Sequence, residues 1–285
     1  MDRPVLLDGA MGTLLQEQGL ADGAPAELWN LENPEAVRAV HAAYAQAGAR
    51  LLTTNSFGGT RPRLDMHGLG DRAGDVNRTA AQLARSVADE HGLLVAGGLG
   101  PTGELLAPLG TLTHAQAQAF FAEQLTALVE GGIDLVLVET LSDLGEADAA
   151  LSAAREVAPG LPVAVTMSFD TNLRTMMGVR PGDAVAHLAA AGAAAVGANC
   201  GRGPEEMEII AAEMAQARTG DVLLVAQSNA GLPQVVGDHF EYDADADDLA
   251  AHATRLAELG IDLVGGCCGS TPAHIAAMGA TLIPT

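Results

Sequence analysis

Three cysteines are the residues of this 285-residue chain best suited to chemistry. Cys267 and Cys268 are adjacent, flanked by glycines, and end a short apolar run over residues 262–266. Cys200 ends a similar run over residues 195–199. Each run has the length and apolarity of a buried strand, so each would deliver its thiols at a strand's carboxyl end. If the two strand ends are neighbours, three thiolates can hold zinc and leave a fourth position open, as a catalytic zinc requires.

Adjacent cysteines can also be two small buried residues or form a strained vicinal disulfide. The third cysteine in a matching context and the flanking glycines favour the metal site. A zinc ion would lower the pKa of a thiol substrate that takes the open position. Because a thiolate beside three other sulfur ligands remains electron-rich, the predicted site suits alkylation of a thiol more than activation of water.

Two carboxylates also follow strand-like runs. Asp8 and Glu139 have no neighbouring Lys or Arg, and we interpret them as anions that receive a substrate ammonium. The alternative is a carboxylate that caps a helix or fixes a loop. The backbone N–H groups of Gly9, Ala10 and Met11 follow Asp8 directly and could bind a carboxylate. An ammonium site beside a carboxylate site indicates an amino-acid substrate.

Two asparagines at strand ends are further candidate substrate contacts. Asn55 closes the second apolar run, although it could instead tie strand-end backbone together. Asn229 lies in a Ser-Asn-Ala-Gly stretch, which is equally typical of a turn.

The elements that must position these residues form a regular alternation along the chain. Ala-rich segments with helical spacing separate eight apolar runs, and glycines end several of these segments just before the next run. The apolar runs cover residues 5–8, 50–55, 93–97, 134–139, 162–167, 195–199, 222–226 and 262–266. The helical segments cover residues 34–47, 75–91, 113–131, 146–157, 181–191, 204–217 and 244–259.

This alternation predicts an α/β fold, a (β/α)₈ TIM barrel that forms a single domain over residues 1–285. A doubly wound sheet is the competing architecture. The barrel is favoured because polar residues stand at the ends of runs spread over the whole chain, and no Gly-x-Gly-x-x-Gly sequence follows the first. We expect the irregular stretches 58–72, 100–112 and 228–243 to form loops on the active face.

Composition excludes several classes of protein. The net charge of −22 provides no basic face, so we expect no nucleic-acid partner. No apolar run of about 18 residues or more is present, so we expect no membrane span. We also expect no secretory signal, because the amino terminus has no long apolar segment. Three cysteines do not make a disulfide framework, and a reducing cytoplasm fits them best.

Taken together, the strand-end motifs resemble those of the zinc-dependent homocysteine S-methyltransferases. That family includes betaine–homocysteine methyltransferase, the S-methylmethionine-dependent enzymes and the homocysteine domain of cobalamin-dependent methionine synthase. The resemblance covers nearly the whole chain in the family's order, and the Gly-Gly-Cys-Cys-Gly element with an upstream Asn-Cys is highly specific. The matching motifs are Leu7–Thr13, Thr54–Phe57, Gly98–Pro101, Glu139–Thr140, Gly197–Cys200, Asn229–Pro233 and Gly265–Gly269.

The resemblance implies a role for each motif. The three cysteines look like the zinc ligands, and Asp8 and Glu139 look like contacts to the homocysteine amino group. Amides from Gly9 to Met11 look like its carboxylate site, and Asn229 is similar to a residue that can approach zinc when substrate is absent. The implied reaction is methyl transfer to the zinc-bound homocysteine thiolate, giving methionine in a (β/α)₈ barrel homocysteine-binding domain.

The methyl donor is the part that the resemblance leaves open. A small onium donor, betaine-type or S-methylmethionine, is the leading expectation, with Phe57 best placed for its positive charge. An alternative is the stand-alone homocysteine module of a split cobalamin-dependent methionine synthase, with a corrinoid protein as partner. A third possibility is a non-catalytic zinc- or thiol-binding barrel. A homo-oligomer is compatible with all three.

Overall fold

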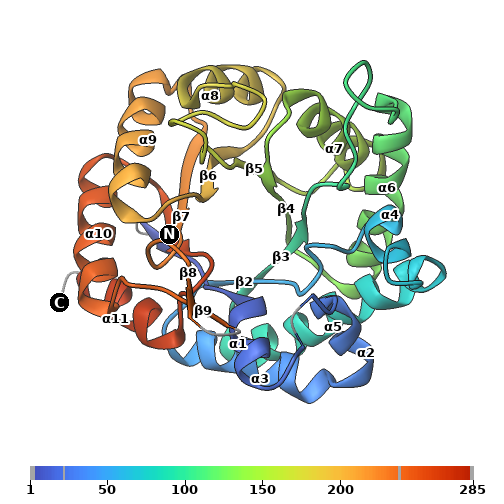
Figure 1. Ribbon diagram of the computed structural model, residues 1–285, viewed down its shortest axis with the longest axis horizontal. Helices are drawn as coiled ribbons and strands as arrows, with labels where there is room; N and C mark the ends of the chain where they lie inside the picture. The colour runs from blue at the N-terminus through green and yellow to red at the C-terminus, as the bar shows by residue number, and fades with distance from the viewer. Residues whose placement is uncertain (1–3, 22, 237–238, 283–285) are drawn as a thin grey trace.

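A closed ring of parallel strands forms the centre of the molecule, and helices surround it (Figure 1). The computed structural model describes residues 4–21, 23–236 and 239–282. The eight parallel strands are β1 (Val5–Leu6), β2 (Leu51–Thr53), β3 (Leu94–Leu99), β4 (Leu135–Leu141), β5 (Val163–Met167), β6 (Ala195–Cys200), β7 (Leu223–Ser228) and β10 (Leu263–Gly266). They pair in the order β1-β10-β7-β6-β5-β4-β3-β2.

A single parallel bridge between Leu7 and Leu51 joins the two ends of this order and closes the barrel. The Asp8 carboxylate continues the seam, because it accepts hydrogen bonds from the Thr53 backbone N–H and hydroxyl, at 2.6 and 3.0 Å. All eight predicted strands are present, so the predicted (β/α)₈ barrel is confirmed and the doubly wound alternative is wrong.

All seven predicted helical segments are helical. They correspond to α3 (Pro34–Gln46), α5 (Ala73–His91), α6 (His114–Gly131), α7 (Leu144–Val157), α8 (Pro181–Ala190), α9 (Pro204–Ala217) and α10 (Ala246–Glu258). The structure adds α1 (Met11–Glu17), α2 (Trp29–Glu32), α4 (Arg61–Asp65) and α11 (Pro272–Leu282), with 3₁₀ turns η1 (Ala26–Leu28) and η2 (Gly70–Arg72). Most of these additions are too short to show a helical period in the sequence.

Glycines with positive φ connect helices to strands, as the sequence predicted. Gly48, Gly132, Gly192 and Gly260 have φ values of 99°, 98°, 92° and 85°. Residues with a Cβ rarely adopt this conformation, so glycine at these positions lets each helix end and the chain turn back into the barrel.

An apolar plug fills the end of the barrel opposite the carboxyl ends of the strands. Seven strands or strand ends each contribute one buried side chain to it, namely Leu7, Leu51, Ala96, Leu137, Ala164, Ala195 and Val225. A larger cluster packs between strands and helices, and alanines supply much of its helix side. Because the plug closes one end, a ligand can reach the strands only from the carboxyl side.

The three stretches expected to be irregular lie at those carboxyl ends. Residues 58–72 contain α4 and η2, and residues 228–243 contain an antiparallel hairpin of β8 (Gln234–Val236) and β9 (His239–Glu241). Within residues 100–112 an isolated bridge joins Leu106 to Leu112. Two of the three stretches therefore have more regular structure than predicted.

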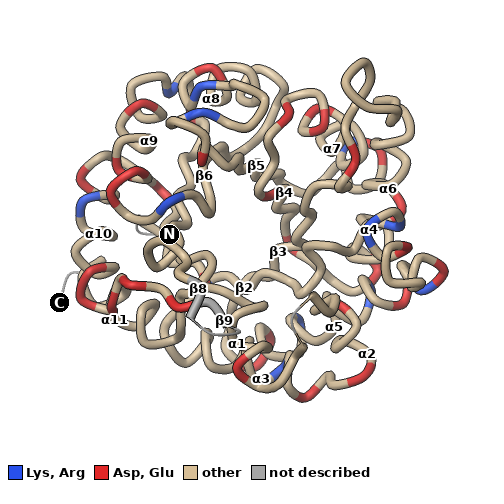
Figure 2. The backbone as a smooth tube through the Cα atoms, viewed as in Figure 1, with Lys and Arg blue, Asp and Glu red and all other residues tan. Residues whose placement is uncertain are grey.

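The acidic residues are spread around the ring of helices (Figure 2). A net charge of −22 distributed in this way favours solubility and offers no basic surface. Among the described residues, no helix combines the length and the apolar character needed to cross a bilayer.

Candidate active site at the carboxyl ends of the strands

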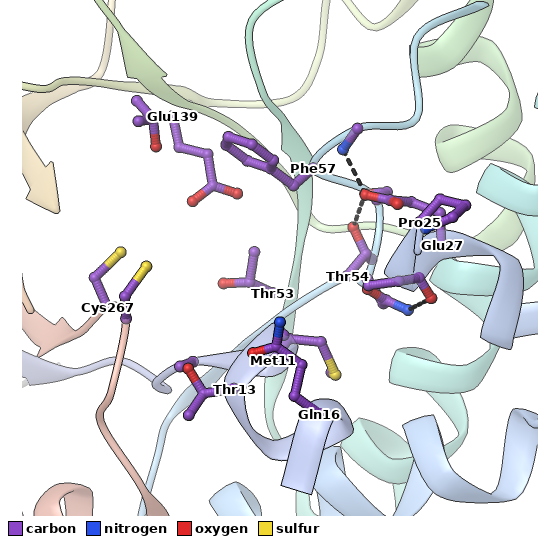
Figure 3. A pocket seen from close by; sticks show the side chains of 18 of the residues that line it. Met11, Thr13, Gln16, Pro25, Glu27, Thr53, Thr54, Phe57, Glu139 and Cys267 are labelled. Carbon is purple, nitrogen blue, oxygen red and sulfur yellow. Dashed lines mark hydrogen bonds between the residues drawn. The ribbon is translucent and has the colours of Figure 1, made fainter. Parts of the chain in front are cut away.

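A cavity of about 500 Å³ opens at the carboxyl ends of the strands (Figure 3). It collects residues from the first, second, fourth, sixth, seventh and last barrel strands and from the loops that follow them. Ten of the eleven predicted site residues line it, namely Asp8, Gly9, Ala10, Met11, Asn55, Phe57, Glu139, Cys200, Cys267 and Cys268. Asn229 is outside this lining.

The three thiols converge as predicted. The Sγ atoms of Cys200 and Cys267 are 3.0 Å apart, and all three Sγ atoms lie within 4.8 Å of one another. Two Zn–S bonds of about 2.3 Å at a tetrahedral angle would place their sulfurs about 3.8 Å apart. The thiols therefore fit a metal with a preference for sulfur ligands after small rotations of their side chains.

Asn199 fixes the strand end that carries Cys200. Its Oδ1 accepts hydrogen bonds from the Thr140 N–H (2.8 Å) and the Thr166 hydroxyl (2.7 Å), and its Nδ2 donates to the Thr140 hydroxyl (2.7 Å). The same Nδ2 lies 3.5 Å from the Cys200 sulfur. Thr140 and Cys200 both have φ near 60°, which is unfavourable for residues with a side chain. The buried Asn199 amide thus holds two strained residues at the rim of the cavity.

A second network lies behind the cysteines. The Ser228 carbonyl accepts a 2.7 Å hydrogen bond from the Cys267 N–H, and the Ser228 hydroxyl lies 2.6 Å from His252 Nε2. His252 Nδ1 in turn lies 2.8 Å from the Glu208 carboxylate. This Ser-His-Glu order resembles that of a hydrolase, but Ser228 is buried and outside the cavity lining. The network therefore serves to position the cysteine-bearing strand ends.

The thiol cluster concentrates negative charge on one sulfur. Hydrogen bonds from Cys200 and Cys267 lower the pKa of the Cys268 thiol. The Cys267 thiol behaves in the opposite way: hydrogen bonds with Cys200 and Cys268, together with burial, raise its pKa. Without a cation the cluster therefore keeps protons, and a divalent metal would displace them as it binds.

Both predicted carboxylates face the same cavity. Burial raises the pKa of Glu139 to about 8, with further contributions from the charges of Asp8 and Cys268. Burial also raises the pKa of Asp8 to about 6, against the opposing effect of its hydrogen bonds from Thr53. An ammonium placed between these carboxylates would restore their charge, which is the behaviour expected of a site for a substrate amine.

The backbone N–H groups after β1 differ in whether they are free to donate to a substrate carboxylate. The Ala10 N–H already donates to the Ser270 hydroxyl at 3.1 Å. Met11 begins α1, and the first turn of a helix leaves its N–H groups without partners in the helix. Gly9 has no room for a side chain, since an added Cβ would lie 2.6 Å from Ser270 Oγ and 2.9 Å from the Tyr44 hydroxyl. The amides of the first turn of α1 are thus the better donors to a carboxylate.

The two asparagines differ in their hydrogen bonding. The Asn55 side chain donates to the Ala26 carbonyl and to Asn30 Oδ1, so it ties the second strand end to the η1 turn. Asn229 donates to the Gly201 carbonyl at 2.8 Å, while its buried Oδ1 has no partner among the described residues. Asn229 is thus hydrogen-bonded to the residue that follows Cys200, and its side-chain oxygen is free to accept another bond. This placement is compatible with an approach of that oxygen to a metal held by Cys200.

Two further residues contribute to the site in ways that the sequence did not predict. Gln227 lines the cavity from β7, and its buried Oε1 has no partner in the part of the chain that the structure describes. Tyr242 follows the hairpin, packs over Gly269 and forms a hydrogen bond with Cys268 that lowers the pKa of that thiol. The position of Gln227 at a strand end could have identified it, whereas Tyr242 depends on a hairpin that the sequence pattern did not predict.

Fold and site together define a class of protein: a (β/α)₈ barrel whose cavity brings together three thiols that could hold a metal and two carboxylates. The family model described as homocysteine S-methyltransferase matches residues 5–282. The chain therefore belongs to the homocysteine S-methyltransferase family.

Two groups of relatives are similar to this chain. Methionine synthases of Mycobacterium leprae and Mycobacterium tuberculosis are each 34% identical to it over 96% of its length. The chain spans only 24% of the length of these two relatives. The metallated form of the homocysteine methyltransferase MmuM from Escherichia coli superposes with a TM-score of 0.81 at 28% identity, covering 98% of this chain and 96% of the other.

Proposed function

We propose that this protein transfers a methyl group from a small onium donor to the thiol of homocysteine, giving methionine, with zinc as its metal. The observation that carries the proposal is the convergence of three thiols and two carboxylates in one cavity. Family membership and the similarity to a metallated homocysteine methyltransferase support it.

Each group in the cavity has a role in this reaction. Cys200, Cys267 and Cys268 hold the zinc, and the chemistry it supplies there is a lowered pKa for the incoming thiol. Asp8 and Glu139 bind the substrate ammonium. The protein's own contribution to the rate is largely orientation, because the thiol and the donor methyl group must lie in line.

The proposal that the methyl donor is an onium compound is supported by the cavity wall that carries Phe57. This ring is 37% exposed and lines the cavity, so its face is available to a positively charged methyl donor. A reducing compartment such as the cytoplasm would keep the three thiols free for metal.

A second candidate is favoured by the 34% identity with methionine synthases over 96% of this chain. In that case the chain is a homocysteine module, and its methyl donor is a corrinoid carried by a partner protein or domain. The residues that bind homocysteine are the same in both candidates.

Methionine formation by zinc-loaded, reduced protein tests the proposal. The donors would be betaine, S-methylmethionine, dimethylsulfoniopropionate and methylcobalamin, each supplied with homocysteine. Turnover with an onium donor supports the leading proposal, and turnover with methylcobalamin alone supports the second. A protein that binds zinc and homocysteine but transfers no methyl group from any donor would be a non-catalytic barrel, contrary to both.

A further inference from the structure

The cavity extends well beyond the residues assigned to homocysteine. Its inner part contains the cysteines, Asp8 and Glu139. Its outer part is lined by residues 23–27, by Phe57 and by Arg63. In Figure 3, Cys267 lies on one side and Pro25 and Glu27 lie on the opposite side, with Phe57 and Glu139 along the wall between them. A donor must approach the homocysteine sulfur from this outer part.

Arg63 is an unusual residue to find on that wall. The chain has 36 acidic residues against 14 arginines and lysines, and most described arginines have an acidic partner. Arg61, two residues earlier in α4, pairs with Glu123 and Asp71. Among the described residues, no carboxylate lies within 4.0 Å of the Arg63 guanidinium. The side chain that lines the cavity is therefore the unpaired one.

The loop after β3 supports Arg63 and Phe57 together. A Cβ added to Gly103 would lie 2.8 Å from Arg63 Cδ, and one added to Gly100 would lie 2.7 Å from Phe57 Cδ2. Both side chains thus lie directly on the backbone of residues 100–103. Gly103 has a φ of 85°, so glycine is also required there by the backbone. The same short loop thus supports both side chains, and both line the same cavity.

Glu27 adds a negative charge to the same part of the cavity. It is buried, and its Oε1 accepts a hydrogen bond from the N–H of Gly58, the residue after Phe57. The outer wall therefore presents an aromatic ring and a carboxylate, both of which attract a cation, next to a guanidinium that attracts an anion. A ligand with a positive and a negative group separated by a short chain matches this arrangement.

We propose that Arg63 binds the carboxylate of the methyl donor, which makes the donor an onium carboxylate. This inference rests on the proposed function. The guanidinium forms paired hydrogen bonds with the carboxylate, while the onium centre lies against Phe57 and points its methyl group toward the homocysteine sulfur. The sulfur lone pair forms the new S–CH₃ bond as the bond from methyl to the onium atom breaks. That bond's electron pair stays on the departing amine or thioether, so no oxidant or reductant is needed.

The test compares Arg63→Gln with Arg72→Gln, a control that removes an exposed arginine outside the cavity lining. We expect Arg63→Gln to raise the KM of the best onium carboxylate by about 10–100-fold. Its kcat, zinc content and homocysteine affinity should match those of the wild type. The KM of Arg63→Lys should fall between those of the wild type and Arg63→Gln, because lysine keeps the charge and loses the paired geometry.

A second measurement checks the carboxylate directly. The second ligand is the carboxamide of betaine, in which an uncharged amide replaces the carboxylate and the onium charge remains. Calorimetry with homocysteine present should show tighter binding of betaine than of this carboxamide in the wild type, and no preference in Arg63→Gln. The same comparison with S-methylmethionine and dimethylsulfoniopropionate distinguishes donors with and without an amino group. Equal KM values for wild type and Arg63→Gln, a preference that persists in the variant, or transfer from methylcobalamin alone would overturn the inference.

The two proposals fail in different ways. If the protein binds S-methylmethionine through Arg63 but does not transfer its methyl group, the proposed reaction is wrong and the carboxylate site at Arg63 is retained. If the KM for methyl transfer is the same in Arg63→Gln as in the wild type, the carboxylate site at Arg63 is wrong and the proposed reaction is retained.

Discussion

At the scale of single residues, the site is dominated by groups that carry or acquire negative charge. Three thiols and two carboxylates line the inner cavity, and Arg63, which lines the outer part, has no acidic partner among the described residues. Like charges in a poorly hydrated site raise one another's pKa values unless cations balance them. The substrate ammonium and a divalent metal are the cations that would do so.

Replacing one thiol should remove the metal and leave the fold. We expect Cys267→Ala to lose tight zinc binding and methyl transfer, because two thiols cannot complete the site. Its unfolding free energy should lie within about 1 kcal/mol of that of the metal-free wild type, since Cys267 is outside the hydrophobic core clusters. Metal analysis and chemical denaturation measure both quantities. A variant that is unfolded at room temperature would assign the cysteines a structural role instead.

The raised pKa of Glu139 predicts a dependence of stability on pH. A carboxyl whose pKa rises on folding, here from 4.5 to about 8, favours the folded state in its protonated form. Its contribution is complete below the unfolded value and is lost as pH rises through about 8. In metal-free protein, Glu139→Gln should therefore gain stability over the wild type between about pH 5 and pH 8, by about 1–2 kcal/mol after the site relaxes around the charge.

Denaturant titrations of both proteins at the two pH values provide the check. The difference between the two proteins measures the carboxyl of Glu139 together with its electrostatic coupling to Asp8, Cys200 and Cys268. A constant difference across this pH range would mean that the carboxyl keeps its ordinary pKa. In functional assays the same variant should need more homocysteine and should still retain zinc.

At the scale of elements, the strand ends require close backbone contacts. Gly265 of β10 lies beside the end of β1, where an added Cβ would sit 2.7 Å from Leu7 Cβ and 2.9 Å from the Asp8 carbonyl oxygen. We expect Gly265→Ala to destabilise the fold by about 1–3 kcal/mol, because overpacking moves backbone atoms. Gly160→Ala is the matched control, since nothing lies within 4 Å of its added Cβ. Equal melting temperatures for the two variants would show that the contact between β10 and β1 relaxes without cost.

The sequence was most informative about these elements where a repeated pattern determines them. Apolar runs and helix-ending glycines predicted all eight strands and seven helices, because burial and left-handed turns restrict residue type strongly. Short helices such as α4 and the β8–β9 hairpin were missed, because their form depends on contacts with distant loops. The stretches that carry Arg63 and Tyr242 were expected on the active face, but the contacts of these two side chains were not predicted, for the same reason.

The candidate site was predictable to the extent that strand ends determine it. Cys200, Cys267 and Glu139 share a cavity because parallel strands deliver their carboxyl ends to one face. Asn229 was placed at the correct strand end, but its lack of contact with the cavity depends on the turn toward Gly201. Hydrogen bonds of this kind cannot be read from spacing along the chain.

At the scale of the whole molecule, the metal should be dispensable for folding. A continuous apolar core surrounds the strands, and the thiols contribute only at one rim. Zinc should therefore add to the stability of an already folded barrel, by about 1.4 kcal/mol for each tenfold rise in free zinc above its Kd. Thermal unfolding over a zinc titration measures this slope. A chain that loses its cooperative transition when zinc is removed would contradict it.

We propose above all that three cysteines bind zinc and leave one position for the homocysteine sulfur. X-ray absorption at the zinc edge, recorded before and after homocysteine is added, tests it most directly. We expect three sulfur ligands and one lighter ligand in the resting protein, and four sulfur ligands with homocysteine bound. A sulfur count that stays at three when homocysteine is bound, or a resting site with four sulfurs, would contradict it.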